Sequence, residues 1–156
     1  VILNGKNLKK KRLHIFYTIA NKRCIVVADG YFEWKKSQEK KSPYFLHDSK
    51  KKIMALAGLW TSIDSENGKV DSYVIVTTQA SQHVAHIHDR MPLIIDDDKI
   101  DMWLGINDND NKKLMDLKPN CSLSYYPVSS FVNHSKNDSK KCIQPLQKEE
   151  SLNLFQ

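Results

Sequence analysis

Glu33 is the first residue of this chain that could exchange a proton with a substrate. It lies among aromatic residues in the segment Gly-Tyr-Phe-Glu-Trp at positions 30–34, which predicts a β-strand. If side chains alternate along that strand, Glu33 and Tyr31 share one face, and Phe32 and Trp34 share the other. A carboxyl group in this setting is either exposed or partly desolvated. Desolvation would raise its pKa and suit it to proton transfer.

His88 is the second such residue, and it is followed by Asp89 and Arg90. An imidazole beside a carboxylate and a guanidinium is a common composition of an acid–base site. Together with His83 and His86, the same histidine could instead form an H-x2-H-x-H metal cluster, although that spacing matches no common zinc pattern. From the residues alone, an acid–base site, a metal site and a purely structural histidine all stay open.

The elements that must position these side chains belong to a chain of ordinary globular composition. It has 156 residues, of which 40% are hydrophobic and 27% charged. This composition argues against global disorder, a coiled coil and a collagen-like chain. Its longest apolar stretches, such as residues 53–60, fall far short of the ~20 residues that a membrane-spanning helix needs. We therefore expect a folded domain with no membrane segment.

The charge and the cysteines indicate which partners the chain could bind and in which compartment it works. There are 24 Lys and Arg against 18 Asp and Glu, a net charge of +6, and lysines cluster at 9–11, 35–36, 40–41, 50–52 and 140–141. Such clusters either form a basic face for a polyanion or are solvated loop tips. The three cysteines, Cys24, Cys121 and Cys142, are widely spaced and form no C-x-x-C pair. We expect reduced thiols in a cytoplasmic protein.

Short apolar runs between turn residues predict six or seven strands and two or three short helices. The strands are expected at 23–28, 31–34, 44–47, 53–60, 73–78, 93–95 and 122–128, with a polar loop at 62–69. Short helices are expected within 79–88, from Asp96 as N-cap to Leu104, and within 112–117. Because strands do not alternate with long helices, the pattern predicts a single, mainly-β α+β domain over residues 1–146 and a tail over 147–156.

Four segments of the sequence together resemble one family. Residues 24–34, C-I-V-V-A-D-G-Y-F-E-W, are similar to the signature of the SOS response-associated peptidase (SRAP) family, whose members shield abasic sites in DNA. Residues 87–92 (I-H-D-R-M-P), 127–133 (P-V-S-S-F-V-N) and 142–145 (C-I-Q-P) match further family motifs in the same order. The resemblance runs from Asn4 to Pro145 and implies mixed sheets folded into a pseudo-barrel, with a few short helices.

The resemblance implies a genome-maintenance protein that binds single-stranded DNA and crosslinks covalently to abasic sites. Family members begin Met-Cys-Gly-Arg, and removal of Met exposes a cysteine whose amine and thiol react with the sugar aldehyde. This chain begins at Val1, so we expect the nucleophile to lie upstream and the chain alone to be inactive. Glu33 would act on the terminal amine, His88 would move a proton to and from the sugar, and Asn4 would position the reactants.

The resemblance also implies contacts with DNA. Lys6, which stands where the family has Arg, and Arg90 would bind phosphates. Thr77 would add a hydroxyl contact, and Trp34 would either stack near the DNA or pack in the core. No cofactor and no metal is expected. Besides crosslinking, the resemblance implies a lyase-like activity, and the family name implies thiol peptidase activity, including self-removal of the initiator Met.

The last residues suggest a partner. The segment S-L-N-L-F at 151–155 resembles the Q-L-x-L-F peptide by which bacterial proteins dock on the replicative sliding clamp, through Leu152, Leu154 and Phe155 here. The tail could instead pack on its own domain. We expect a cytoplasmic monomer, associated with the nucleoid if bacterial. Two other functions remain as alternatives: a single-stranded DNA-binding module without chemistry, and a metal-dependent hydrolase using His83, His86 and His88.

Overall fold

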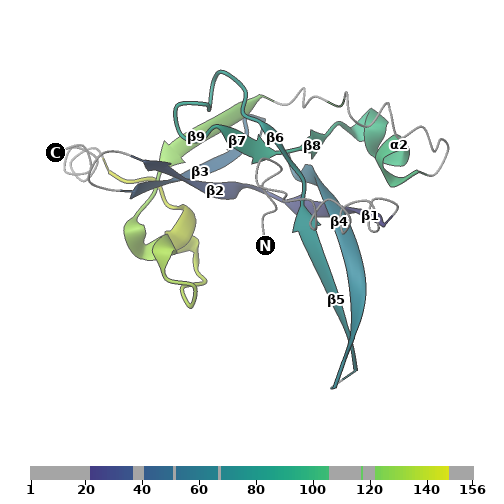
Figure 1. Ribbon diagram of the computed structural model, residues 1–156. Coiled ribbons are helices and arrows are strands. Elements are labelled where there is room, and N and C mark those ends of the chain that lie inside the picture. The colour runs from purple at the N-terminus through teal and green to yellow at the C-terminus, as the bar shows by residue number, and fades with distance from the viewer. Residues whose placement is uncertain are drawn as a thin grey trace. The chain divides into compact units, whose positions relative to one another are not determined.

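The computed structural model describes residues 22–36, 41–50, 52–66, 68–105, 117 and 122–147. The chain groups into two compact units, each containing its own antiparallel sheet (Figure 1). The first unit consists of Val1–Ala28, Met54–Gln79 and Met91–Cys121, and the second of Asp29–Ile53, Ala80–Arg90 and Ser122–Gln156.

The first unit is built around strand β4 (Met54–Ser65). β4 pairs antiparallel with β1 (Arg23–Ala28), β5 (Gly68–Ile75) and β8 (Ile94–Ile95). Apolar residues of β4, of β8 and of the position just before β8 meet the tryptophan of a short helix in a buried cluster. Full burial of each large apolar side chain contributes ~1.5–3 kcal/mol to folding. The cluster consists of Ala57, Leu59, Leu93, Ile95 and Trp103.

The helical segment after β8 differs from the single helix predicted at 96–104. It divides into a 3-10 helix, η2 (Asp97–Lys99), and an α-helix, α2 (Ile100–Leu104), which ends at Gly105 with φ of 74°. The predicted cap was wrong: the Asp96 side chain makes no capping hydrogen bond and instead accepts one from Lys99 Nζ at 2.8 Å. The predicted apolar face was correct, because Ile100, Trp103 and Leu104 all pack into the core cluster.

The polar segment at 62–69 is not the loop that its composition predicted. β4 and β5 continue as a long hairpin through the pairs Ile63–Val70 and Ser65–Gly68 (Figure 1). Gly68 takes a φ of 107°, in the left-handed region where glycine is not strained, so the hairpin can close tightly. Pairing along the backbone therefore overrides the polar side chains, most of which point to solvent.

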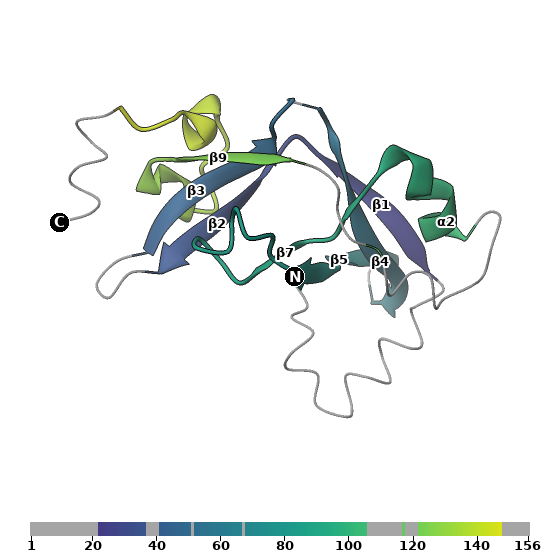
Figure 2. The same cartoon turned by 90° about the horizontal axis from the view of Figure 1, so that it is seen from above.

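The second unit contains a three-stranded antiparallel sheet in the order β2-β3-β9, seen from above in Figure 2. The strands are β2 (Tyr31–Lys36), β3 (Lys41–Asp48) and β9 (Leu123–Pro127). β3 is the central strand, and Ser42 to Leu46 within it are buried. Gly30 precedes β2 against the Phe45 ring and the carbonyl oxygen of Leu46, leaving no room for a Cβ.

Several shorter elements complete the described chain. β6 (Thr77–Gln79) and β7 (Arg90–Pro92) form a two-stranded sheet. The 3-10 helices η3 (Ser130–Asn133) and η4 (Lys140–Ile143) follow β9. The predicted helix within 79–88 is wrong, since residues 82–87 form successive turns, and the predicted strand at 73–78 is interrupted at Val76. The helix expected at 112–117 lies outside the described residues except for Leu117, and so does the tail expected at 147–156 except for Gln147.

The mainly-β α+β class is confirmed, and none of the sheets formed by the described residues closes into a barrel. The extent of the domain, 1–146, stays a prediction. Within the described ranges, no helix is both long and apolar enough to cross a bilayer.

Candidate functional site

The two faces of the β2-β3-β9 sheet carry different side chains. Alternation along β2 puts Tyr31 and Glu33 on one face, and Phe32 and Trp34 on the other. The strand register pairs Glu33 with Tyr44 and Trp34 with Pro43. Glu33 and Trp34 therefore leave opposite faces of the same strand, as the sequence predicted.

The loop 80–90 supplies His88 next to the face that carries Glu33. The backbone N–H of Ala80 donates to the carbonyl of Asp89 at 2.9 Å and joins the two ends of the loop. Val84 and Ile87 are buried and anchor it.

Two other histidines of the same loop contact the sheet. The rings of His83 and His86 lie 5.3 and 5.2 Å from the ring of Tyr125, measured between centroids. Tyr125 in turn contacts Tyr44 edge-on, at 6.1 Å. Because Tyr44 is the strand partner of Glu33, these contacts hold the loop against the face from which Glu33 projects.

The segment after β9 is attached to the residues of the opposite face. Tyr126 donates its hydroxyl to the carbonyl of Ile143 at 2.9 Å, and Trp34 Nε1 donates to Asn133 Oδ1 at 2.7 Å. The backbone N–H of Val128 donates to the carbonyl of Pro43 at 3.0 Å, which ties the start of this segment to β3. Asn133 is thereby brought beside Trp34.

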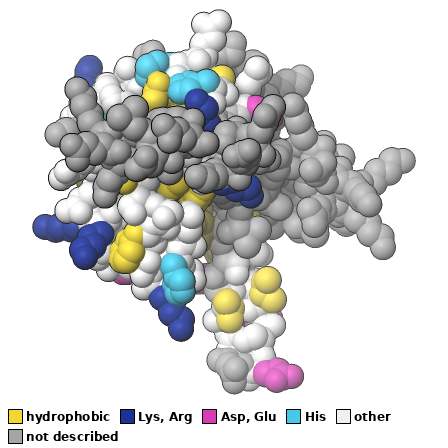
Figure 3. Space-filling view, turned by 90° about the vertical axis from the view of Figure 1, so that its left-hand side faces the viewer, with side chains coloured by type: hydrophobic (Ala, Val, Ile, Leu, Met, Phe, Trp, Pro, Cys, Tyr) yellow, Lys and Arg dark blue, Asp and Glu magenta, His cyan; other side chains and the backbone are white. Residues whose placement is uncertain are grey.

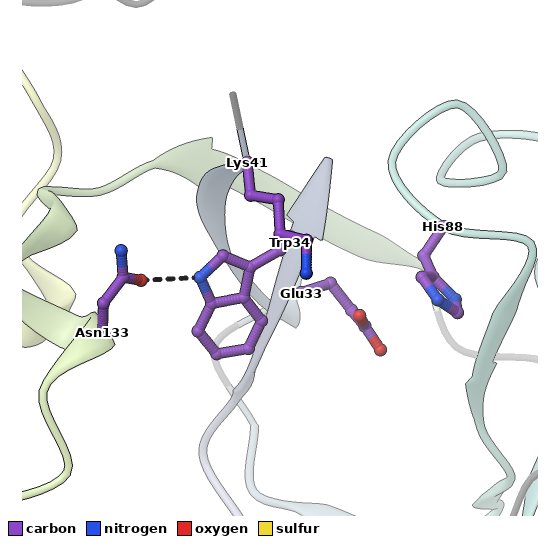
Figure 4. A pocket seen from close by; sticks show the side chains of 5 residues that line it. All are labelled: Glu33, Trp34, Lys41, His88 and Asn133. Carbon is purple, nitrogen blue, oxygen red and sulfur yellow. Dashed lines mark hydrogen bonds between the residues drawn. The ribbon is translucent and has the colours of Figure 1, made fainter. Parts of the chain in front are cut away.

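A hollow of about 370 Å³ brings residues of both faces together. In the sheet formed by the described residues, β2 is an end strand, so side chains from its two faces can both border a space beside its outer edge. Figure 4 shows the Glu33 carboxylate on the side of the indole nearer His88, and Asn133 on the other side. The residues that line the hollow are Glu33, Trp34, Lys41, His88 and Asn133.

Burial raises the pKa of the Glu33 carboxyl above its ordinary value. The charge of His88 and a backbone hydrogen bond with Trp34 oppose this rise, and the charge of Asp89 adds to it. A carboxyl group with a raised pKa holds a proton more readily near neutrality and can return it to a reacting group. Glu33 thus has the electrostatic setting of an acid–base residue.

The Nδ1 atom of His88 has partners whether or not it carries the ring hydrogen. Its Nδ1 accepts a hydrogen bond from the backbone N–H of Arg90 at 3.1 Å when it carries no proton. The same nitrogen lies 3.2 Å from the carbonyl oxygen of Arg90 and 3.4 Å from Asp89 Oδ1, which accept when Nδ1 carries a proton. One nitrogen cannot do both at once, so the surroundings of Nδ1 accommodate either tautomer of the ring.

The other predicted site residues are placed less directly. Arg90 is half-buried at the start of β7, and Thr77 is half-buried in β6 of the first unit. Neither lines the hollow. Asn4 and Lys6 lie outside the described residues, so their roles stay predictions. The metal alternative finds no geometric support, because the described part of the chain has no group of three His, Cys, Asp or Glu placed to hold one ion.

Lys41 and Asn133 line the hollow but were not singled out from the sequence. Lys41 was counted only within a lysine cluster, and Asn133 only as the last residue of the P-V-S-S-F-V-N match. Lys41 is exposed, and its side chain reaches toward Trp34 and Glu33 in Figure 4. On the face drawn in Figure 3, dark-blue Lys and Arg and cyan His side chains recur, while acidic side chains are few among the coloured residues.

The sequence motifs agree with a match to a protein family. The family model described as "SOS response associated peptidase (SRAP)" matches residues 7–135. The chain therefore belongs to the SOS response associated peptidase family.

Curated relatives of the chain are named abasic site processing proteins. The chain is 31% identical over 151 residues to the abasic site processing protein HMCES of Gallus gallus, covering 83% of the chain and 45% of the relative. It is 34% identical over 131 residues to the abasic site processing protein YoqW of Bacillus subtilis, covering 81% of the chain and 58% of the relative. The chain thus spans about half the length of these relatives.

A solved structure from Bacteroides thetaiotaomicron has the same fold, with a TM-score of 0.69 and 28% identity. The match covers 82% of this chain and 59% of that one.

Proposed function

We propose that the protein containing this chain binds abasic sites in single-stranded DNA and crosslinks to them through a cysteine upstream of Val1. One observation carries the proposal: Glu33 and His88, far apart in the sequence, line the same hollow. The relatives named abasic site processing proteins support the choice of substrate. The hollow is bordered by groups that suit an aldehyde-bearing sugar: a carboxyl, an imidazole, an ammonium and an indole.

The proposed chemistry joins both nucleophiles of an N-terminal cysteine to C1′ of the open sugar. The amine adds to the aldehyde, and loss of water gives an imine. The thiolate then adds to the imine carbon, the imine nitrogen takes up a proton, and a thiazolidine ring results. Glu33 would take the proton from the amine, and His88 would deliver a proton to the oxygen that leaves as water. Reversal needs the same transfers in the opposite direction.

The DNA contacts follow from the side chains at and near the hollow. The Lys41 ammonium would pair with a phosphate beside the abasic nucleotide, and the Trp34 indole would stack on a base. Arg90 would bind a second phosphate, bidentately if its guanidinium turns outward. Lys6, Thr77 and Asn4 keep the roles that the family resemblance implies.

The test uses full-length protein with its native N-terminus and a single-stranded oligonucleotide with one abasic site. We expect an adduct that survives heat and denaturing electrophoresis, and none with an intact oligonucleotide of the same sequence. Replacing the N-terminal cysteine by alanine should abolish the adduct while leaving DNA binding in place. Binding without an adduct in the native protein would contradict the proposal and favour a binding module without chemistry.

Two predictions extend this function. Thiol peptidase activity would be seen as removal of the initiator Met, read by mass spectrometry of the native protein and of a variant that lacks the cysteine.

Docking on a sliding clamp through Leu152, Leu154 and Phe155, which lie outside the described residues, would be tested by pull-down with and without Leu154→Ala and Phe155→Ala. Unchanged capture by the double variant would overturn the clamp prediction.

A further inference from the structure

The hydrogen bond between Trp34 and Asn133 joins two residues that lie 99 positions apart, at the border of the hollow. The contact is short, 2.7 Å from Nε1 to Oδ1, and it is exposed to solvent. Water could replace an exposed hydrogen bond at little cost, so this one adds little to folding. It accompanies one orientation of the indole and uses the only hydrogen-bond donor of the ring.

Asn133 is itself held by its own turn. Ser129 Oγ accepts from the backbone N–H of Phe131 at 3.2 Å and caps η3. Asn137 Nδ2 donates to the carbonyl of Phe131 at 2.7 Å and closes the other side of the turn. Both contacts restrict the backbone from which the Asn133 side chain projects.

A second set of contacts ties this turn to the strand pair that carries Trp34. Pro43 is the register partner of Trp34, and its carbonyl accepts from the backbone N–H of Val128. Val128 is fully buried and lies five positions before Asn133. The amide oxygen of Asn133 is therefore presented to the indole from a fixed direction.

We propose that Asn133 is a positioning residue that holds the Trp34 indole as a stacking wall for the nucleobase next to the abasic sugar. This inference rests on the function proposed above and names the ligand of one side of the hollow. With Nε1 already bonded, the ring offers DNA its π-face rather than a donor. The wall should therefore accept any base, because stacking does not distinguish base edges.

The experiment measures binding and chemistry separately in full-length protein. Affinity is measured with an oligonucleotide carrying a tetrahydrofuran abasic analogue, which has no aldehyde and cannot crosslink. The crosslinking rate constant is measured at saturating concentrations of a true abasic oligonucleotide. The variants are Asn133→Ala, Trp34→Phe and the double variant. Ser130→Ala, exposed in the same turn, is the control.

We expect Trp34→Phe, which keeps a ring but loses the donor, and Asn133→Ala each to weaken affinity by about 2- to 10-fold. This is a partial loss compared with the ~5- to 150-fold that removal of a whole stacking ring can cost. The double variant should be no weaker than Trp34→Phe alone. The saturated rate constant should change less than twofold, and Ser130→Ala should behave as the native protein.

A second pair of oligonucleotides isolates the base. Replacing the bases on both sides of the analogue with further tetrahydrofuran residues should remove the difference between native protein and Asn133→Ala. Additive losses in the double variant, or the same loss with DNA that lacks the neighbouring bases, would overturn the inference. If native protein neither binds nor crosslinks abasic DNA, the proposed function fails; if it does both and Asn133→Ala matches it, only this inference fails.

Discussion

Glu33 and Trp34 are consecutive residues of β2 that project from opposite faces of the sheet, yet both line one hollow. The carboxyl is on the side reached by His88, and the indole is on the side reached by Asn133 (Figure 4). In the described sheet, a single end strand thus separates the carboxyl proposed for proton transfer from the indole proposed for base contact.

Replacing Glu33 by Gln should slow crosslinking by about 10²- to 10⁴-fold, the range that a positioned acid–base group contributes. The amide keeps the size of the side chain but cannot take a proton. Single-turnover crosslinking of full-length protein measures the effect, and binding to the tetrahydrofuran analogue should change little. In the native protein, the acidic limb of the pH–rate profile should lie above the ordinary glutamate pKa, because burial raises that of Glu33.

The same substitution should affect stability with a defined sign. Since the pKa of Glu33 is raised in the folded protein, folding favours the protonated carboxyl, and stability is lost as pH rises from the ordinary glutamate pKa through the folded one. Glu33→Gln should therefore be more stable than the native protein at pH 7 and equally stable at about pH 3.5, below the ordinary value of ~4.3. Urea denaturation at both pH values checks this. Glu66→Gln, in the exposed turn of the β4–β5 hairpin, is the control, and a destabilised Glu33→Gln at pH 7 would contradict the argument.

Lys41→Gln should weaken binding to single-stranded DNA and flatten its dependence on salt. If the ammonium neutralises one phosphate, the slope of log K against log salt should fall in magnitude by about 0.7. Fluorescence anisotropy at three or more salt concentrations measures the slope. Lys50→Gln removes the same charge from an exposed turn outside the lining of the hollow. Equal slopes for the two variants would mean that Lys41 contributes only to the general charge.

Gly30→Ala should destabilise the protein by about 1–3 kcal/mol. An added Cβ would overlap the Phe45 ring and approach the Leu46 carbonyl oxygen to 2.8 Å, so β3 would have to move away from the chain just before β2. Thermal unfolding followed by circular dichroism measures the loss. Crosslinking should also slow, because the displacement occurs three residues before Glu33. A native melting temperature would show that Phe45 can turn aside at no cost.

The alternation of side chains and the short β-branched runs in the sequence were enough to predict the strands that carry or precede the site. Alternation along β2 correctly predicts Glu33 and Trp34 on opposite faces, and two of the family motifs contain Glu33 and His88. The strand at Arg23–Ala28 was correct for the same reason, since a β-branched run ending at Asp-Gly leaves little choice.

The features of the site that the sequence did not predict depend on contacts between segments that are distant in the sequence. Residues 79–88 show polar, helix-compatible composition, but the burial of Val84 and Ile87 and the His83 and His86 contacts with Tyr125 favour successive turns. Asn133 lies beside Trp34 because the segment after β9 is hydrogen-bonded to β3. No spacing rule in the sequence reports such a contact, and for the same reason Lys41 could not be told from its neighbouring lysines.

The pairing of β2 with β3 has one further consequence. Because adjacent positions in β2 serve different purposes, a slip of the pairing by one residue would exchange their sides and turn the carboxyl toward Asn133 and the indole toward His88. Insertions into the connection between these two strands should therefore be tolerated only when they preserve the present alignment. On the proposed function, the alignment of β2 with β3 should therefore determine reactivity as much as the reacting groups do.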